Sequence, residues 1–382
     1  MCPSPIVNRD MKVLHIDTEP TWRGGEQQAL LLARGLLRRG VETSVLGQPG
    51  SPLLARTRQE RIPSHAIAMH SEADLGAVYR IVRLLSRERP GIIHMHTSHA
   101  HALGVAAAKL TGIGRTVVSR RVDFSIHRAP LRLGLLKYRL GVDRIIAISR
   151  AVREVLVRDG IPAERVELVP SGVDLQELDA TPRIDFHREL SIPRGAPVVG
   201  NVAHFGWHKA QEELVKAAPL IWERFPEARI VLVGDGSCRP KVERTAREVG
   251  ADGRLIFTGY RADARALIRW FDAFAICSVL EGLCTSIMDA HALGTPVAAT
   301  RVGGIPELVR HRETGLLVPP RDPSALAAAI GALLHDPDLG RRMSLAGRAL
   351  VERSFSAETM VGGTLDVYSR VLQQVEADHR GV

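Results

Sequence analysis

The chain has 382 residues, is 45% hydrophobic and has a mean hydropathy of +0.00, so it can bury the cores of two domains and is not intrinsically disordered. Its 51 basic and 42 acidic residues give a net charge of +9, yet residues 1–175 alone carry 26 basic and 16 acidic residues, or +10. No run approaches 18 apolar residues and residues 1–10 contain no apolar signal region, so we expect a cytoplasmic protein without a membrane span or a secretory leader.

In the first half of the chain, short apolar runs alternate with segments of helical spacing. Such alternation is typical of a parallel sheet with helices on both faces. The predicted strands are 11–17, 41–46, 92–94, 116–119 and 144–148, and the predicted helices are 26–39, 74–89, 100–110, 131–140 and 150–159.

A stretch rich in Asp, Pro and Gly at 171–193 reads as a linker, and a second alternation follows it. The predicted strands there are 197–203, 229–233, 255–258, 273–277 and 296–300, and the predicted helices are 211–224, 239–249, 262–270, 285–293, 323–334, 338–351 and 356–376. We therefore expect an α/β protein of two facing, Rossmann-like, doubly wound domains, 1–175 and 176–382. Ligands of such sheets bind at the carboxyl ends of the strands, so the expected site is the cleft between the domains.

Three strand-end loops carry residues suited to a phosphorylated ligand. Gly24 and Gly25 open a helix directly after the first strand, where the backbone can approach a ligand closely. His204 and Lys209 follow the first strand of the second half, and both can donate to phosphate oxygens. Taken alone, the glycine loop reads equally well as a plain strand–helix turn, whereas His204 and Lys209 read more readily as two surface cations.

The third loop is the most specific, because Glu281 and Asp289 stand eight apart across a strand–loop–helix junction. The amides of Cys284, Thr285 and Ser286 would form the helix N-terminus between them, which favours a diphosphate. Carboxylates at either end can accept hydrogen bonds from sugar hydroxyls. The spacing alone does not exclude an ordinary acidic helix start.

Taken together and in order, these stretches resemble the retaining family-four, or "group 1", nucleotide-sugar glycosyltransferases of the GT-B fold. The resemblance covers nearly the whole chain. It also includes the segments 165–174, 233–236, 294–297, 303–307 and 314–318.

The resemblance implies roles position by position. Lys209 matches the lysine on the donor diphosphate, and Glu281 matches the acid that contacts the donor sugar. Asp289 matches the acid on the ribose hydroxyls, and Gly25 matches the glycine beside the phosphates. His204 stands where the family usually has Arg, while Ala210, Cys284 and Asp289 replace residues that are often Gly, Gly and Glu.

The resemblance further implies transfer with retention, no metal or other cofactor, and no dedicated protein nucleophile. Lys209, His204 and the helix amides would stabilise the leaving diphosphate, and Glu281 would orient the donor sugar. The donor would be UDP- or GDP-linked. The last helix, about 356–376, would pack back on the first domain.

Two further clusters lie in the first half. His94, His96, His99 and His101 invite a metal reading, but no acidic residue lies among them, so we interpret them as residues that line the cleft or begin a helix. His96, His99 and Arg121 are candidates for acceptor or sugar contact, and an Arg at position 121, where the family often has His, could bind a carboxylate or phosphate.

A basic, leucine-rich segment carries Arg128, Arg132, Lys137 and Arg139, and reads equally well as a membrane-surface element or as a solvated face. Because the charge excess lies in residues 1–175, we expect it to face an anionic membrane or an anionic glycolipid acceptor. We expect no nucleic-acid partner, since aromatic residues make up only 4% of the chain.

The leading hypothesis is therefore a glycosyltransferase of envelope polysaccharide, lipopolysaccharide or glycolipid synthesis, at the inner face of the plasma membrane. The alternatives are a degenerate sugar-nucleotide-binding protein, favoured by His204 and Asp289, and a sugar-nucleotide epimerase of the same fold. Cys277 and Cys284 are predicted to be core and loop residues rather than nucleophiles.

Overall fold

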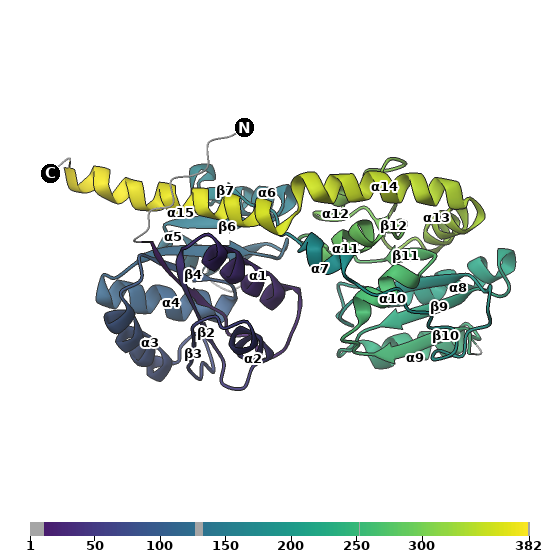
Figure 1. Ribbon diagram of the computed structural model, residues 1–382, viewed down its shortest axis with the longest axis horizontal. Coiled ribbons are helices and arrows are strands. Elements are labelled where there is room, and N and C mark those ends of the chain that lie inside the picture. The colour runs from purple at the N-terminus through teal and green to yellow at the C-terminus, as the bar shows by residue number, and fades with distance from the viewer. Residues whose placement is uncertain (1–10, 127–132, 252, 381–382) are drawn as a thin grey trace. The chain divides into compact units, whose positions relative to one another are not determined.

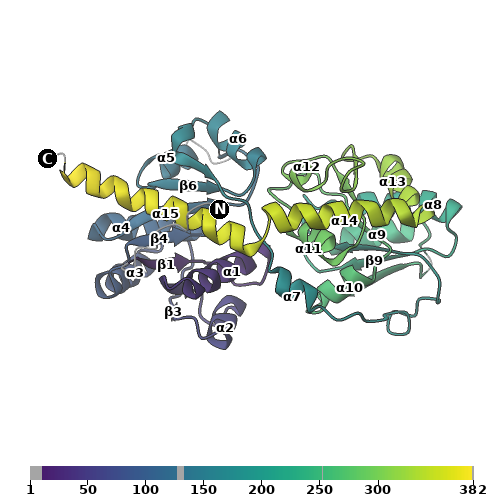
Figure 2. The same ribbon diagram turned by 45° about the horizontal axis from the view of Figure 1, so that its top comes forward.

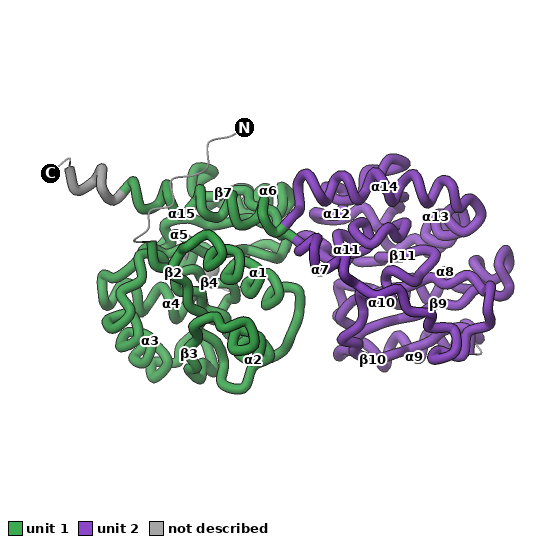
Figure 3. The backbone as a smooth tube through the Cα atoms, in the orientation of Figure 1, with its two compact units in different colours: residues 1–172, 357–382 green, residues 173–356 purple. Residues whose placement is uncertain are grey.

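The computed structural model describes residues 11–126, 133–251 and 253–380, which divide into two compact units (Figure 3). Unit 1 contains the chain up to Gly172 and returns from Ala357 onward, and unit 2 is the continuous stretch Val173–Ser356. The chain first passes from unit 1 to unit 2 between Gly172 and Val173, three residues before the expected boundary between residues 175 and 176.

Unit 1 is built on a seven-stranded parallel sheet with the order β3-β2-β1-β4-β5-β6-β7. Its strands are β1 (Lys12–Ile16), β2 (Glu42–Gly47), β3 (Ser64–Ala66), β4 (Ile92–Met95), β5 (Arg115–Arg120), β6 (Arg144–Ala147) and β7 (Val166–Leu168). Its helices are α1 (Gly24–Arg38), α2 (Pro52–Gln59), α3 (Leu75–Glu88), α4 (Ser98–Thr111), α5 (Leu133–Arg139), α6 (Arg150–Arg158), the 3₁₀ turn η3 (Ala163–Arg165) and α15 (Ala357–Arg380).

The strand residues of unit 1 alternate between two covered faces. Val13, Ile92 and Val117 lie in one apolar cluster with residues of α1 and α15. Ile16 and Met95 point to the other face, where α4 approaches so closely that a Cβ at Gly104 would lie 2.5 Å from the Met95 sulfur. In Figure 1 and Figure 2, α15 runs beside α1 along the first of these faces.

Unit 2 is built on a six-stranded parallel sheet with the order β10-β9-β8-β11-β12-β13. Its strands are β8 (Val198–Val202), β9 (Arg229–Val233), β10 (Leu255–Gly259), β11 (Ala273–Ile276), β12 (Val297–Thr300) and β13 (Leu316–Val318). Its helices are α7 (Leu175–Asp179), α8 (Gln211–Arg224), α9 (Arg239–Glu248), α10 (Ala264–Trp270), α11 (Thr285–Leu293), α12 (Ile305–Leu308), α13 (Pro323–His335) and α14 (Pro337–Ser354).

The helices of unit 2 also form two layers. Helices α8, α9 and α13 contribute to one large apolar cluster with the sheet, while α7, α10 and α14 pack around α11. Buried strands of continuous apolar residues, such as β9 and β11, are what a parallel sheet covered on both faces requires. The predicted fold class, two Rossmann-like α/β domains with parallel sheets, is confirmed.

Candidate active site

Lys209 and Glu281 form an ion pair at the carboxyl ends of two neighbouring strands in unit 2. Lys209 lies in the loop between β8 and α8, and Glu281 lies in the loop between β11 and α11. Lys209 Nζ is 2.6 Å from Glu281 Oε2, and the two side chains are only 17% and 11% exposed. The structure therefore joins two predicted site residues that are 72 positions apart.

Further hydrogen bonds support this pair, one between the two loops and one within the Glu281 loop. The Val279 N–H donates to the His208 carbonyl at 2.8 Å, and the Ser278 hydroxyl donates to Glu281 Oε2 at 3.2 Å. Burial alone lowers the pKa of Lys209, but the adjacent Glu281 carboxylate outweighs it, so that the pKa of Lys209 is raised overall. Lys209 is therefore a fixed cation at neutral pH.

His204 lies near the start of the same loop and is exposed. Its ring lies over Gly236, where a Cβ would be 2.5 Å from the His204 Cε1 and 2.6 Å from the Phe205 carbonyl oxygen. The loop ends at Ala210, whose φ of 48° and ψ of 42° lie in the left-handed region that favours glycine. The chain thus keeps a glycine-like backbone at a position where it has an alanine.

Helix α11 begins at Thr285, with Cys284 as its N-cap residue and no side-chain hydrogen bond capping it. The side chains of Thr285 and Ser286 are half-buried beside this positive helix end. Burial raises the pKa of the Cys284 thiol to about 11 and that of Cys277 to about 12. Both therefore stay protonated at neutral pH, and neither is an activated nucleophile.

Asp289 lies on the second turn of α11 and faces an arginine that the sequence did not single out. Arg265 Nε, on α10, is 3.6 Å from Asp289 Oδ1, and Arg265 Nη1 is 3.1 Å from Glu177 Oε2 on α7. Burial raises the pKa of Asp289, while Arg265 lowers it and Glu177 raises it. The pattern of acids eight apart contains no signal for this arginine.

In unit 1, α1 begins at Gly24, and its N-cap Arg23 N–H donates to the Glu26 carboxylate at 2.7 Å. Gly25 lies beside Arg121, because a Cβ at Gly25 would be 3.8 Å from Arg121 Cδ, an ordinary contact distance. The structure thus places the predicted glycine loop next to Arg121, which stands where the resembled family often has a histidine.

Polar side chains form a column on the face of the unit 1 sheet that α1 and α15 cover. Strand alternation places His15 and Asp17, His94 and His96, and Ser119 and Arg121 on this face, rising to its carboxyl end. Of these six residues, the sequence interpretation had named only His96 and Arg121 as candidates for acceptor or sugar contact. The i, i+2 spacing of these pairs at successive strand ends is the sequence signal that predicts the other four residues of the column.

One hydrogen-bond chain runs through this column in a defined direction. Arg121 donates to Ser171 Oγ at 3.4 Å and to His96 Nδ1 at 3.3 Å. Because a guanidinium only donates, His96 carries its proton on Nε2, which donates to His15 Nδ1 at 3.0 Å. Burial lowers the pKa of His96 well below its ordinary range and that of His15 to about 3, so both are neutral imidazoles.

The C-terminal helix takes part in the same cluster. The Tyr368 hydroxyl on α15 is 2.6 Å from His94 Nδ1, and His94 Nε2 is 2.8 Å from Ser119 Oγ. The His94 ring lies 4.2 Å from the His96 ring, measured between centroids. Tyr368 therefore holds the imidazole against which the candidate contact residue His96 packs.

Two buried acids lie near Arg121. Burial, with a smaller effect of Glu26, raises the pKa of Asp17 to about 7. Burial also raises the pKa of Glu26, and it lowers the pKa of Arg121 to about 10. Among the described residues Arg121 has no carboxylate within ion-pair distance, so its guanidinium is held by the neutral groups Ser171 and His96.

The imidazoles of His15, His94 and His96 each offer a ligand atom within 4.8 Å of the others, which is the spacing of a candidate metal site. The adjacent Arg121 charge disfavours a cation there, and both nitrogens of His94 already have protein partners. The hydrogen bonds leave one buried ring nitrogen of these three imidazoles, His15 Nε2, without a partner. That the protein needs no metal remains a prediction.

The predicted contact residue His99, the clustered His101 and the predicted membrane-surface residue Lys137 have separate surroundings. His99 is exposed at the start of α4, and His101 is a core residue whose Nε2 is 3.1 Å from the Lys137 carbonyl. Lys137 is not a free surface cation, because its Nζ is 2.7 Å from Glu72 Oε1 and 2.7 Å from the Ser98 carbonyl.

Of the other basic residues in that segment, Arg139 is exposed and donates to the Gly160 carbonyl at 2.9 Å. Arg128 and Arg132 lie outside the described residues.

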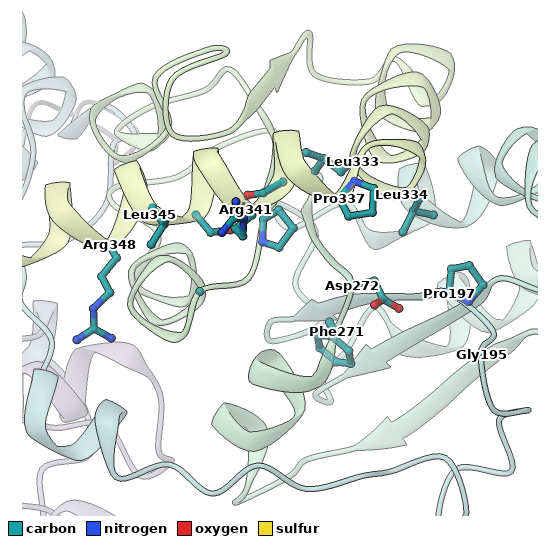
Figure 4. Close-up of a pocket in the computed structure, with 14 residues that line it drawn as sticks. Gly195, Pro197, Phe271, Asp272, Leu333, Leu334, Pro337, Arg341, Leu345 and Arg348 are labelled. Atoms are coloured by element: carbon teal, nitrogen blue, oxygen red, sulfur yellow. Dashed lines mark hydrogen bonds between the residues drawn. The ribbon is translucent and has the colours of Figure 1, made fainter.

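A cavity of about 460 Å³ in unit 2 lies away from these residues (Figure 4). Its lining includes Pro197, Asp272 and Pro296, which precede β8, β11 and β12, together with Leu333 and Arg341. It therefore lies at the amino ends of the strands, whereas Lys209 and Glu281 lie at the carboxyl ends.

No helix within the described ranges is both long and apolar enough to cross a membrane.

Two family models match the chain and together cover most of it. The model described as "Glycosyltransferase Family 4" matches residues 22–177, and the model described as "Glycosyl transferases group 1" matches residues 196–336. The first match extends five residues past Gly172, the end of the first part of unit 1, and the second lies wholly within unit 2.

Relatives with named activities align over most of this chain. A D-inositol 3-phosphate glycosyltransferase of Nocardia farcinica is 30% identical over 345 residues, which is 87% of this chain and 73% of the relative. A 2-deoxystreptamine glucosyltransferase of Streptomyces kanamyceticus is 27% identical over 90% of this chain and 98% of its own.

Among solved structures, HepE of Anabaena in complex with UDP and glucose matches with a TM-score of 0.83 at 22% identity, over 94% of this chain and 99% of that one. At this identity the match supports the fold and leaves the specificity open.

Proposed function

Because the chain belongs to the group 1 and family 4 glycosyltransferases, we propose that it transfers a hexosyl group with retention of configuration at the anomeric carbon. As a member of this family with the GT-B fold, it is a glycosyltransferase that uses a nucleotide-sugar donor. Retention, the hexosyl group and the residue roles below are our proposals.

The observation that carries this assignment is the Lys209–Glu281 pair beside the start of α11. We assign Lys209, His204 and the backbone amides of Cys284, Thr285 and Ser286 to the donor diphosphate. Cations and a positive helix end suit the negative charge that develops on a leaving diphosphate.

In the proposed reaction, an acceptor hydroxyl oxygen forms a bond to the anomeric carbon while the bond from that carbon to the diphosphate breaks. A phosphate oxygen of the leaving group takes the hydroxyl proton. Glu281 orients the donor sugar, Asp289 accepts from the ribose hydroxyls, and Gly24 and Gly25 let the backbone approach the phosphates. No metal takes part in this scheme.

We assign the acceptor to unit 1. Arg121 and His96 lie together at the carboxyl end of its sheet, and His99 lies at the start of α4. A guanidinium held only by neutral groups suits a phosphate or carboxylate on the acceptor. One relative acts on D-inositol 3-phosphate, and another is a phosphatidylinositol monomannoside mannosyltransferase of Mycobacterium tuberculosis. We therefore propose a phosphorylated or lipid-linked acceptor in envelope glycan or glycolipid synthesis.

The test is a screen of UDP- and GDP-sugars with candidate acceptors, with the products identified by mass spectrometry. Lys209→Ala and Glu281→Ala should each lower the rate of transfer by about a hundredfold or more, since each removes a charged group placed at the reaction centre. Lys216→Ala, which removes a half-exposed lysine on the neighbouring α8, is the matched control and should leave the rate unchanged.

The other outcomes contradict the proposed site or the proposed reaction. Undiminished transfer in both variants removes the proposed site. Donor binding without transfer indicates a degenerate sugar-nucleotide-binding protein. Interconversion of free sugar nucleotides without any acceptor indicates an epimerase.

We also propose that the basic segment around Arg128, Arg132 and Arg139 contacts the anionic inner face of the plasma membrane. Co-sedimentation with liposomes should require anionic lipid and should weaken when these three arginines are neutralised. Binding that is indifferent to both changes overturns the proposal. Lys137 is left out of the variant because Glu72 already pairs with it.

A further inference from the structure

Three charged side chains from three helices of unit 2 meet, and one of them is the proposed nucleotide-binding acid Asp289. Arg265 lies on the first turn of α10, Asp289 on the second turn of α11, and Glu177 on α7. Arg265 Nη1 donates to Glu177 Oε2 at 3.1 Å, and Arg265 Nε is 3.6 Å from Asp289 Oδ1. The side chains of Arg265 and Asp289 are 25% and 15% exposed.

The arginine contacts the two acids in different ways. Its bond to Glu177 is a hydrogen-bonded ion pair, whereas its approach to Asp289 is longer than a hydrogen bond. Asp289 Oδ1 and Arg265 Nη2 are both buried and have no hydrogen-bond partner. One guanidinium is thus shared by two carboxylates. Glu177, which lies outside the proposed donor site, holds it more closely than Asp289 does.

Two other arginines on the surrounding helices already have partners. Arg269 on α10 donates to the carbonyls of Thr181 and Leu178. Arg348 on α14 pairs with Asp179 on α7. Within the described part of the chain, the ion pair that Asp289 makes is therefore the one with Arg265.

We propose that Arg265 is a positioning residue that holds Asp289 ionised and oriented for a ribose hydroxyl, and that Glu177 competes with Asp289 for this guanidinium. The inference rests on the proposed role of Asp289 in binding the donor nucleotide. An ionised carboxylate can accept hydrogen bonds from two hydroxyls, whereas a protonated one loses acceptor capacity. Nucleotide affinity therefore depends on how well the charge of Arg265 keeps Asp289 ionised although its side chain is largely buried.

The two neighbours act on Asp289 in opposite directions. Burial raises the pKa of Asp289, Arg265 lowers it and Glu177 raises it. Removing the arginine charge should move the loss of nucleotide affinity at acid pH to higher pH. Removing the Glu177 charge should move it to lower pH. A purely structural role for either residue predicts no such opposition.

The experiment measures the affinity of the whole protein for UDP and for GDP by calorimetry, between about pH 5 and about pH 8. Wild type is compared with Arg265→Met, Arg265→Lys and Glu177→Gln. Arg269→Met, one turn further along α10, is the matched control. Because the nucleotide titrates equally in every sample, only the difference from wild type at each pH is used.

We expect Arg265→Met to bind UDP about tenfold more weakly than wild type at the acid end and nearly as tightly at the alkaline end, since one pKa unit changes the ionised fraction tenfold below the pKa. Glu177→Gln should bind more tightly at the acid end, and Arg265→Lys should restore most of the loss. Arg269→Met should leave the pH profile unchanged even if thermal unfolding shows that it is less stable.

A second probe locates the contact. With 3′-deoxy-UDP and 2′-deoxy-UDP, the difference between Arg265→Met and wild type should shrink for the sugar that lacks the contacted hydroxyl. Equal losses with all three nucleotides overturn the inference, as do shifts of the same sign in Arg265→Met and Glu177→Gln. If wild type binds neither UDP nor GDP, the proposed donor class fails as well, which separates that failure from failure of Arg265 alone.

Discussion

The two units place their functional side chains in opposite ways. In unit 2, Lys209 and Glu281 stand on loops that leave the strands, and a short ion pair joins them. In unit 1, His15, His94 and His96 stand on the strands themselves or directly after them, and all three are neutral rings. His15 and His96 share a hydrogen bond, while His94 is bonded to Tyr368 and Ser119. Unit 2 thus holds its site with opposite charges, whereas unit 1 holds most of its cluster by keeping buried groups uncharged.

The largest expected effect tests the charged half of this comparison. Lys209→Met or Glu281→Gln alone leaves a buried charge without its partner and should lower the free energy of unfolding by about 3 to 4 kcal/mol. The double variant should lose clearly less than the sum of the two, as measured by chemical denaturation without ligand. Additive losses would show that the pair does not stabilise unit 2.

The next effect tests the uncharged half through Asp17. The pKa of Asp17 is raised from 3.8 to about 7, so its favourable contribution to stability is complete below 3.8 and is lost as the pH rises toward 7. Asp17→Asn keeps an acceptor for the Glu19 N–H. Because its amide does not ionise, the stability of the variant does not fall with pH in this way. The variant should gain on the order of 2 to 3 kcal/mol relative to wild type between pH 4 and pH 7, and little more above it.

Asp338→Asn, at an aspartate whose side chain is 78% exposed, is the control for Asp17→Asn. A stability difference between Asp17→Asn and wild type that stays constant with pH would contradict the burial of an uncharged Asp17.

The smallest effect tests the tie between α15 and the cluster. Tyr368→Phe leaves His94 Nδ1 without its partner and should lower the free energy of unfolding by about 1 to 2 kcal/mol. Tyr79→Phe is a fitting control because Tyr79 is 63% exposed. If the two variants were equally stable in denaturant, the hydroxyl of Tyr368 would not be holding His94.

The sequence predicts the elements of unit 2 closely where the apolar period is strong. The predicted helices 211–224 and 285–293 have the bounds of α8 and α11. It misses the strands β3, β7 and β13, each of three residues, which are too short to show a period. It also reads 171–193 as a linker, although Asp174 caps the short helix α7 there.

Site prediction from the sequence succeeds for loop motifs and fails for contacts between distant segments. Lys209 and Glu281 belong to recognisable loops, and the structure brings them together. Arg265 and Tyr368 carry no local signal, since their partners come from other helices and strands, and Tyr368 is 274 residues from His94. Alternation along β1 and β4 could have identified His15 and His94, because strand residues two apart share a face.

The return of α15 to unit 1 makes unit 2 an insertion, with consequences for synthesis on the ribosome. The sheet of unit 2 comes from one continuous stretch of chain, so it is complete when Ser356 has emerged. His94 and the apolar face around it must wait for Tyr368 and the rest of α15. Domains generally fold in the order in which they are made. Here the unit that is begun first is the one that is finished last.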